Sequence, residues 1–177
     1  MTADAIKRKL EKLFNATDAN NDGYVEWVDY QRIVDRYLAA FNIDKDERKG
    51  QTLQVTYQMY WLELLRHANR SQHLTKDEYI AANRAASVDT SRFNMVEGIP
   101  HAIVDIMDND DDNEINKEEF AQFLQASGIT APHAMDRFAA LDTDGDGRIS
   151  RQEYVRSVRE FFHSGTDLTA PGSLYFE

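Results

Sequence analysis

The sequence predicts an all-α protein. Apolar residues recur at every third or fourth position along almost the whole chain, which is the period of an amphipathic helix. Proline and glycine are scarce, at 3 and 8 of 177 residues, so few positions would interrupt a helix. No long stretch alternates apolar and polar residues as a half-buried strand would. We therefore expect about eight helices and no long strand.

The apolar sets place the helices in order along the chain. In the first half they are Ile6, Leu10, Leu13 and Phe14; then Trp27, Tyr30, Val34, Tyr37, Leu38 and Phe41; then Leu53, Tyr57, Tyr60, Trp61 and Leu64. In the second half they are Ile99, Ile103, Ile106 and Met107; then Phe120, Phe123 and Leu124; then Tyr154, Val158, Phe161 and Phe162.

Polar stretches and helix breakers separate these sets. Residues 42–50 (NIDKDERKG) have the composition of a linker. Pro100 either opens a helix at its first turn or kinks a continuous one. Gly128 stands where a helix commonly ends. The tail at 164–177 contains turn formers followed by Leu174, Tyr175 and Phe176. We expect this tail to fold back and fill an apolar groove, and a disordered end is the alternative.

Composition and charge narrow the possible functions. Acidic residues number 31 against 20 basic ones, for a formal net charge of -11. This balance argues against nucleic acid as a partner and favours a cation. The absence of Cys excludes disulfides and thiolate zinc sites. The first ten residues lack the apolar run of a signal peptide, and no stretch could span a bilayer. We therefore expect a soluble, cytoplasmic protein with no membrane partner.

The segment from Asp142 to Glu153 (DTDGDGRISRQE) matches the complete twelve-residue EF-hand loop. Its oxygen donors come from alternate positions, and Glu153 at the twelfth position can offer two oxygens. Ca²⁺ takes about six to eight hard oxygen ligands in a tolerant geometry, which this loop supplies. The candidate ligands are Asp142, Asp144, Asp146, the carbonyl of Arg148, Ser150 and Glu153.

A second loop of this kind runs from Asp108 to Glu119 (DNDDDNEINKEE). Asn113 stands where the pattern has glycine, and asparagine is the next best residue for a left-handed backbone, so we expect the loop to survive. The candidate ligands are Asp108, Asp110, Asp112, the carbonyl of Glu114, Asn116 and Glu119.

A third loop runs from Asp18 to Asp29 (DANNDGYVEWVD) and ends in aspartate instead of glutamate. The shorter side chain makes bidentate capture of Ca²⁺ harder, so we expect Mg²⁺ to compete chiefly at this loop. The candidate ligands are Asp18, Asn20, Asp22, the carbonyl of Tyr24, Glu26 and Asp29.

A degenerate loop can be aligned from His67 to Glu78 (HANRSQHLTKDE), with Leu74 at its apolar position. Only Glu78 remains as a carboxylate at a standard ligand position, so we expect no Ca²⁺ there. We expect the loops to pair first with second and third with fourth. The units are then an N-terminal pair at 1–90, a C-terminal pair at 91–165 and a tail at 166–177 that packs on the globule.

The loops and their order resemble the sarcoplasmic calcium-binding proteins and their bacterial relative calerythrin. The matching features are the lost ligands at His67 and Gln72 and the terminal Asp29 of the first loop. The resemblance implies four EF-hand units in two pairs within a compact globule, with three working sites and no catalysis. We therefore expect a monomeric intracellular buffer that binds three Ca²⁺ per chain.

Two other functions stay open. A sensor would open on binding Ca²⁺ and expose a Met-rich groove to a target protein. Met59, Met95, Met107 and Met135 are scattered in the sequence, which favours core filling. A calcium-triggered photoprotein of similar size would need an aromatic cavity. The candidates for its lining are Trp27, Trp61, Tyr57, Tyr60, His101 and His163.

Overall fold

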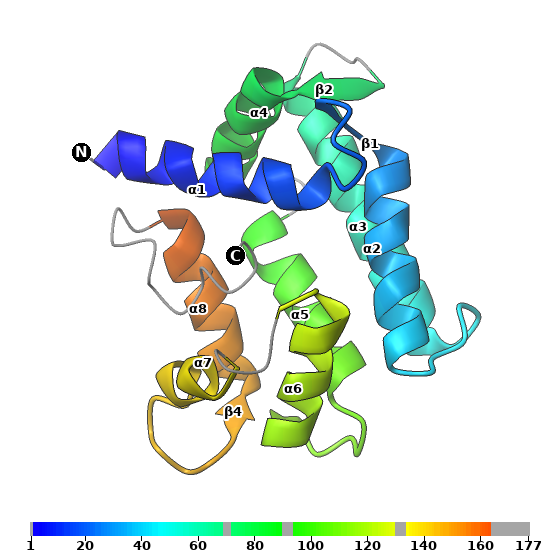
Figure 1. The fold of residues 1–177 in the computed structure, drawn as a ribbon, viewed down its shortest axis with the longest axis vertical. Coiled ribbons are helices and arrows are strands. Elements are labelled where there is room, and N and C mark those ends of the chain that lie inside the picture. The colour runs from blue at the N-terminus through cyan, green and yellow to red at the C-terminus, as the bar shows by residue number, and fades with distance from the viewer. Residues whose placement is uncertain (1, 69–71, 90–93, 130–133, 164–177) are drawn as a thin grey trace.

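The described part of the chain forms eight α-helices, and six of them carry the apolar sets above, which confirms the all-α class. A computed structural model describes residues 2–68, 72–89, 94–129 and 134–163 (Figure 1). The elements in order are α1 (Thr2–Thr17), β1 (Tyr24–Glu26), α2 (Trp27–Ala40), α3 (Arg48–His67), β2 (His73–Thr75), α4 (Lys76–Val88), α5 (Met95–Met107), β3 (Glu114–Ile115), α6 (Lys117–Ala126), α7 (Ala134–Leu141), β4 (Ile149–Ser150) and α8 (Arg151–His163).

Four helix–loop–helix units pair through their short strands. Strand β1 runs antiparallel to β2, with Val25 opposite Leu74, and β3 runs antiparallel to β4, with Ile115 opposite Ile149. All four of these side chains are fully buried. The expected pairing of the first loop with the second, and of the third with the fourth, is therefore confirmed.

The two pairs share one hydrophobic core that includes side chains from all eight helices. Helix α3 of the first pair packs along α5 of the second. Helix α1 approaches α8 (Figure 1), where the buried Lys9 Nζ donates to the backbone oxygen of Phe161 at 3.1 Å. Between α2 and α6, the Gln122 side chain donates to the Ala40 oxygen at 2.6 Å. The fold is consequently compact.

One helix boundary differs from the sequence expectation. Helix α3 begins at Arg48, inside the expected linker. Its first turn lies so close to the preceding loop that a Cβ on Gly50 would be 2.5 Å from the Asp44 oxygen. Of the two alternatives for Pro100, the structure agrees with the second, a continuous helix, because Pro100 lies inside α5 and does not open it. Gly128 follows α6 with φ of +79°, as expected for a helix end.

From the sequence we expect Leu174, Tyr175 and Phe176 to be buried, but these residues lie outside the described part of the chain. Within the described ranges, no helix is both long and apolar enough to cross a bilayer.

Candidate metal centres

The loop between α5 and α6 is built around the carboxylate of its first residue. Asp108 is buried, and its two oxygens accept hydrogen bonds from the backbone N–H groups of Asp112, at 3.1 Å, and Asn113, at 3.0 Å. The Asp112 side chain in turn accepts the N–H of Glu114 at 2.9 Å. These bonds wrap the backbone around the carboxylates, because each side chain satisfies N–H groups that are short of partners in a tight turn.

The sixth position of this loop has the left-handed backbone that the sequence predicts. Asn113 has φ of +65°, beside +87° for Gly23 and +86° for Gly147 at the same position of the other two loops. Asparagine tolerates this conformation better than most residues with a side chain. The expectation that the loop survives without glycine is confirmed.

Glu119, the twelfth residue, closes the loop from its far side. One oxygen accepts the N–H of Asn109 at 2.8 Å and the other accepts the N–H of Asn116 at 3.0 Å. Carboxylate oxygens of Asp108, Asp110 and Glu119 all lie within 4.8 Å of one another. Three carboxylates at this separation repel one another unless a cation lies between them, and their hard oxygens suit Ca²⁺.

The loop between α7 and α8 repeats this arrangement. Asp142 accepts N–H groups from Asp146, at 3.1 Å, and Gly147, at 2.9 Å. Glu153 accepts the N–H groups of Thr143, at 2.9 Å, and Ser150, at 2.8 Å. A second acidic cluster results, with oxygens of Asp142, Asp144 and Glu153 within 4.8 Å of one another.

Electrostatics in the fourth loop depend on these hydrogen bonds. Burial by itself would raise the pKa of Glu153, but donors from Ser150 and Thr143 outweigh it and lower that pKa. The Thr143 hydroxyl is one of these donors, at 2.8 Å. Sequence reasoning missed this residue, although a hydroxyl at the second loop position is a visible signal.

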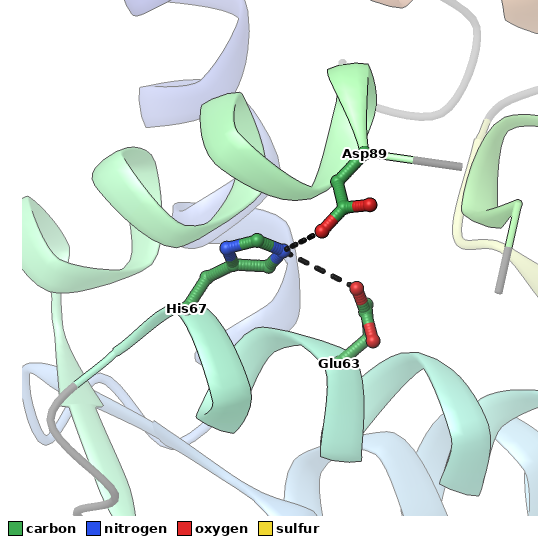
Figure 2. Close-up of side chains that lie close together, drawn as sticks. All are labelled: Glu63, His67 and Asp89. Atoms are coloured by element: carbon green, nitrogen blue, oxygen red, sulfur yellow. Dashed lines mark hydrogen bonds and ion pairs between the residues drawn. The ribbon is translucent and has the colours of Figure 1, made fainter. Parts of the chain in front are cut away.

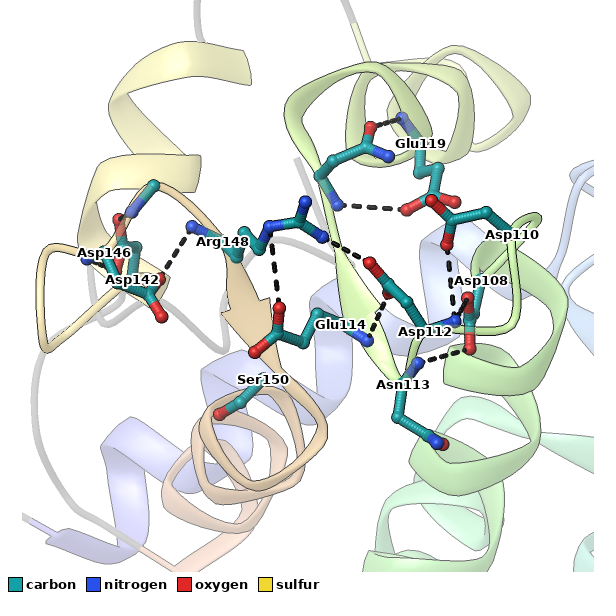
Figure 3. A network of polar contacts seen from close by, with 12 residues as sticks. Asp108, Asp110, Asp112, Asn113, Glu114, Glu119, Asp142, Asp146, Arg148 and Ser150 are labelled. Carbon is teal, nitrogen blue, oxygen red and sulfur yellow. Dashed lines mark hydrogen bonds and ion pairs between the residues drawn. The ribbon is translucent and has the colours of Figure 1, made fainter.

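Arg148 joins the fourth loop to the third (Figure 3). Its guanidinium binds the carboxylate of Asp112 and lies 3.5 Å from an oxygen of Glu114. The backbone N–H of Glu114, and then Arg148, lower the pKa of Asp112. The sequence assigned Arg148 only a carbonyl ligand, so this contact was not foreseen. Among the described residues, neither Asp112 nor Asp146 belongs to an acidic cluster of the kind above.

The loop between α1 and α2 has the same scaffold around its first residue. Asp18 accepts the N–H groups of Asp22, at 3.2 Å, and Gly23, at 3.0 Å. Asp22 accepts the N–H of Tyr24 at 2.9 Å and a side-chain N–H of Asn20 at 2.8 Å. The backbone of this loop therefore resembles that of the third and fourth loops.

Asp29 distinguishes the first loop from the other two. One oxygen accepts the N–H of Glu26 at 2.9 Å, while the other lies 3.3 Å from the Arg32 guanidinium. Within the described residues, this loop has no three carboxylates inside 4.8 Å of one another. Burial raises the pKa of Asp29, and the nearby charges of Asp18 and Asp22 raise it further. The side chain of Asp29 is shorter than that of glutamate, and one of its oxygens is paired with Arg32. These two features explain why the first loop has no cluster of three carboxylates like those of the third and fourth loops.

In the third and fourth loops, the residue at the ninth position directly precedes the following helix and caps it. The Asn116 side chain accepts the N–H groups of Glu118, at 2.9 Å, and Glu119, at 3.0 Å. The Ser150 hydroxyl accepts the N–H of Glu153 at 3.2 Å. Both residues are therefore helix caps in this structure, which also positions the glutamate at the twelfth place.

The degenerate second loop is described only in part. Glu78 accepts the N–H and the hydroxyl of Thr75, each at 2.9 Å, as the other half of a capping box. His67 lies beside Glu63, with 3.2 Å between the ring Nε2 and a carboxylate oxygen.

Lys49 connects α3 to the third loop. Its ammonium donates to the backbone oxygen of Asp108 and pairs with Asp111, each at 2.7 Å. No local signal could have revealed this contact, because the partners are far apart in the chain.

Comparison with known protein families agrees with this geometry. Residues 101–159 match the model of an EF-hand domain pair, and residues 10–34 match the model of an EF hand. The chain belongs to the EF-hand family. It is thus a calcium-binding EF-hand protein, and the predicted family is confirmed.

Relatives of this EF-hand protein span nearly its whole length. It is 27% identical to calerythrin of Saccharopolyspora erythraea, over 97% of this chain and 100% of that protein. It is 25% identical to the luciferin-binding protein of Renilla reniformis, over 96% of this chain and 91% of that protein. A solved Streptomyces coelicolor calcium-binding protein matches with a TM-score of 0.74 and 27% identity, over 89% of this chain and 97% of that one.

Proposed function

We propose that this EF-hand protein is an intracellular buffer that binds three Ca²⁺ ions, in the loops at 18–29, 108–119 and 142–153. The observation that carries the proposal is the shared scaffold, in which the first carboxylate accepts the N–H groups of the fifth and sixth positions. The ligands are those identified in the sequence, with Asn116 and Ser150 acting through water.

The shared core favours a buffer over a sensor. A sensor opens its helix pairs to expose a groove, whereas a buffer barely opens. Here Trp61, Phe120 and Phe123 belong to one continuous buried cluster that crosses both pairs. Opening either pair would expose large aromatic surfaces, each of which contributes about 1.5–3 kcal/mol when buried.

Calorimetric titration with Ca²⁺, with and without Mg²⁺, tests the proposed buffer function. We expect three Ca²⁺ per chain, with Mg²⁺ weakening chiefly the first loop. Glu119→Gln and Glu153→Gln should each remove one site, while Glu78→Gln, the matched change in the degenerate loop, should leave all three. Two or four ions in the wild type would contradict the stoichiometry.

Thermal unfolding supplies a second measurement. The carboxylates of the three loops repel one another without a cation, so Ca²⁺ should stabilise the native state. Each site contributes about 4 kcal/mol at a thousandfold excess over Kd. Equal melting temperatures in chelator and in Ca²⁺ would argue against all three sites.

One surface feature supports the sensor as a second candidate. Val55, Met59 and Leu62 follow one another along the outer face of α3 and are 50%, 43% and 63% exposed. Core filling was expected of both Met59 and Met107: the fully buried Met107 agrees with it, whereas the exposed Met59 contradicts it. If a hydrophobic dye binds only after Ca²⁺ is added, and Leu62→Ser abolishes that binding, the sensor replaces the buffer.

A partly open cavity supports a third candidate, the carriage of a small aromatic molecule. It measures about 270 Å³ and is lined by Tyr30, Tyr37, Tyr57, Tyr60, Arg36 and Phe161 among others. Of the residues put forward for a photoprotein, only Tyr57 and Tyr60 line the described cavity, and His101 and His163 are exposed. We therefore propose that the chain is not an enzyme. Incubation with coelenterazine and a Ca²⁺ pulse tests both alternatives, through ligand fluorescence and through light.

We propose a monomer in the cytoplasm, without nucleic acid or membrane partners. Light scattering of the Ca²⁺-loaded protein and fractionation of cells would test these properties.

A further inference from the structure

A mixed cluster of nitrogen and oxygen ligands lies outside the three acidic loops, where α3 and α4 end (Figure 2). Glu63 and His67 are one helical turn apart near the end of α3, and Asp89 directly follows α4. The His67 Nε2 atom lies 3.2 Å from Glu63 Oε1 and 3.4 Å from Asp89 Oδ2. Three side chains from two helices thus converge on one point.

These separations fit a tetrahedral metal ion. Zn²⁺ binds His nitrogen and carboxylate oxygen at about 2.0–2.2 Å, which places neighbouring ligand atoms roughly 3.3–3.5 Å apart. The Glu63 side chain is 5% exposed and that of His67 is 16% exposed, so two of the ligands are held by their surroundings. A donor set that includes imidazole suits Zn²⁺ or Co²⁺ and not Ca²⁺, which takes oxygen ligands.

A positive group already lies among these three atoms. Arg66 Nη2 contacts both Glu63 Oε1 and Asp89 Oδ2, and it is 3.1 Å from His67 Nε2. A second nitrogen of Arg66, Nε, donates to Glu63 Oε2 at 3.1 Å. The guanidinium therefore occupies the place of a cation, and its side chain is 32% exposed, so it has a route into solvent.

We propose that Glu63, His67 and Asp89 form a transition-metal site of the Zn²⁺ class, in which Arg66 is the competing internal cation. A metal ion would displace the guanidinium and take the three ligand atoms, leaving a fourth position for water. The site is separate from the acidic loops and uses the His at the first position of the degenerate loop. The alternative is that Arg66 makes the cluster a purely structural ion-pair link between α3 and α4.

Titration with Co²⁺ in saturating Ca²⁺ tests the proposal, because Ca²⁺ blocks the acidic loops and tetrahedral Co²⁺ has a distinctive visible spectrum. We expect one equivalent of Co²⁺ with that spectrum, displaced by Zn²⁺. His67→Ala and Asp89→Asn should weaken binding by at least about tenfold, which even the loss of an outer partner of a metal site can cost. Arg66→Gln should tighten binding by removing the competing charge.

Two controls separate this result from its alternatives. His163→Ala, which removes an exposed His at the end of α8, should leave Co²⁺ binding unchanged. Circular dichroism and the Ca²⁺ stoichiometry of each variant show whether it is folded, independently of the Co²⁺ spectrum. If neither the wild type nor Arg66→Gln binds Co²⁺, or if His67→Ala binds it equally well, the cluster is an ion-pair link and the proposal is wrong.

Discussion

At the scale of single residues, small differences separate three loops that share one scaffold. Glu119 and Glu153 each accept backbone N–H groups at both the second and the ninth loop positions. Asp29 accepts the N–H at the ninth position and pairs with Arg32. The first loop therefore differs from the other two in the missing methylene of Asp29 and in the neighbouring guanidinium of Arg32.

Asp29→Glu should shift the first site toward Ca²⁺. The longer side chain can reach the N–H at the second position, as Glu119 does, and can offer two oxygens to a larger ion. We expect selectivity for Ca²⁺ over Mg²⁺ to rise by about tenfold, or roughly 1.4 kcal/mol. Competition calorimetry measures it, with Asp29→Asn as the control that should weaken both metals. An unchanged preference would place the cause elsewhere in the loop.

Arg148→Gln should raise the Ca²⁺ affinity of the third loop. The substitution removes a positive charge that binds Asp112, while the backbone carbonyl of residue 148 is retained for the fourth loop. Because the contact is exposed, we expect only a roughly two- to fivefold gain that diminishes at high salt. Titration beside Arg84→Gln, an exposed site on α4, provides the comparison. A loss of affinity at the third loop would show that Arg148 assists binding.

At the scale of elements, the short strands connect the loops in pairs. Ile115 and Ile149 lie opposite each other on β3 and β4, and both are fully buried. We therefore expect a shift at one loop to be transmitted to the other through this packed contact and through the backbone hydrogen bonds of the ladder.

Ile149→Ala should weaken both the fold and the coupling of the third and fourth loops. Truncation of a buried Ile costs about 2–5 kcal/mol. We expect a lower free energy of unfolding and less cooperative Ca²⁺ binding, with Ile149→Val giving a smaller effect of the same kind. Calorimetry and chemical denaturation measure the two quantities. Full cooperativity in the folded alanine variant would mean that the coupling follows another route.

At the scale of the whole molecule, a group of phenols occupies the interior between the helix pairs. Tyr30, Tyr57 and Tyr60 are at most 6% exposed. Burial, and then the neighbouring phenols, hold the pKa values of Tyr30 and Tyr60 well above their usual value. The Tyr60 hydroxyl donates to Asn83 Oδ1 at 2.6 Å, which keeps it satisfied in its neutral form.

The buried phenols of Tyr30, Tyr57 and Tyr60 should limit the stability of the folded protein at alkaline pH. The pKa values of these phenols in the folded protein exceed the unfolded value of about 10. The neutral phenols therefore contribute fully to the free energy of unfolding below pH ~10, and this contribution is lost as the pH rises through the folded pKa values. We expect a fraction of the phenolate absorbance to appear only on unfolding, whereas in denaturant all phenols should titrate near pH 10. A single reversible native titration near pH 10 would contradict this.

Deletion of residues 168–177 should destabilise the Ca²⁺-bound protein. We propose that Leu174, Tyr175 and Phe176 fill the cavity that Phe161 helps to line, since a chain leaving His163 can reach about 35 Å by residue 174. Each buried side chain is worth about 1.5–3 kcal/mol, less the cost of ordering the segment. We expect a lower melting temperature and more dye binding than in a variant with three serines at 168–170. If deletion changes neither, the tail is dispensable.

Much of the candidate site could be predicted from the sequence because its interactions are local. Each acidic loop folds through hydrogen bonds among twelve consecutive residues, and the amphipathic period alone places the flanking helices. The left-handed Asn113 and the pairing of Leu74 with the first loop were foreseen for this reason, and the structure confirms both.

Only the tertiary structure revealed the contacts between distant parts of the chain. Arg148 reaches Asp112, Lys49 reaches Asp108, and Asp89 joins Glu63 and His67 because separate helices pack into one core. No periodicity or loop pattern in the sequence predicts these contacts, because each depends on how whole helices pack against one another. The sequence by itself therefore determined the class of ion and the ligands put forward, while the packing decided which charges surround them.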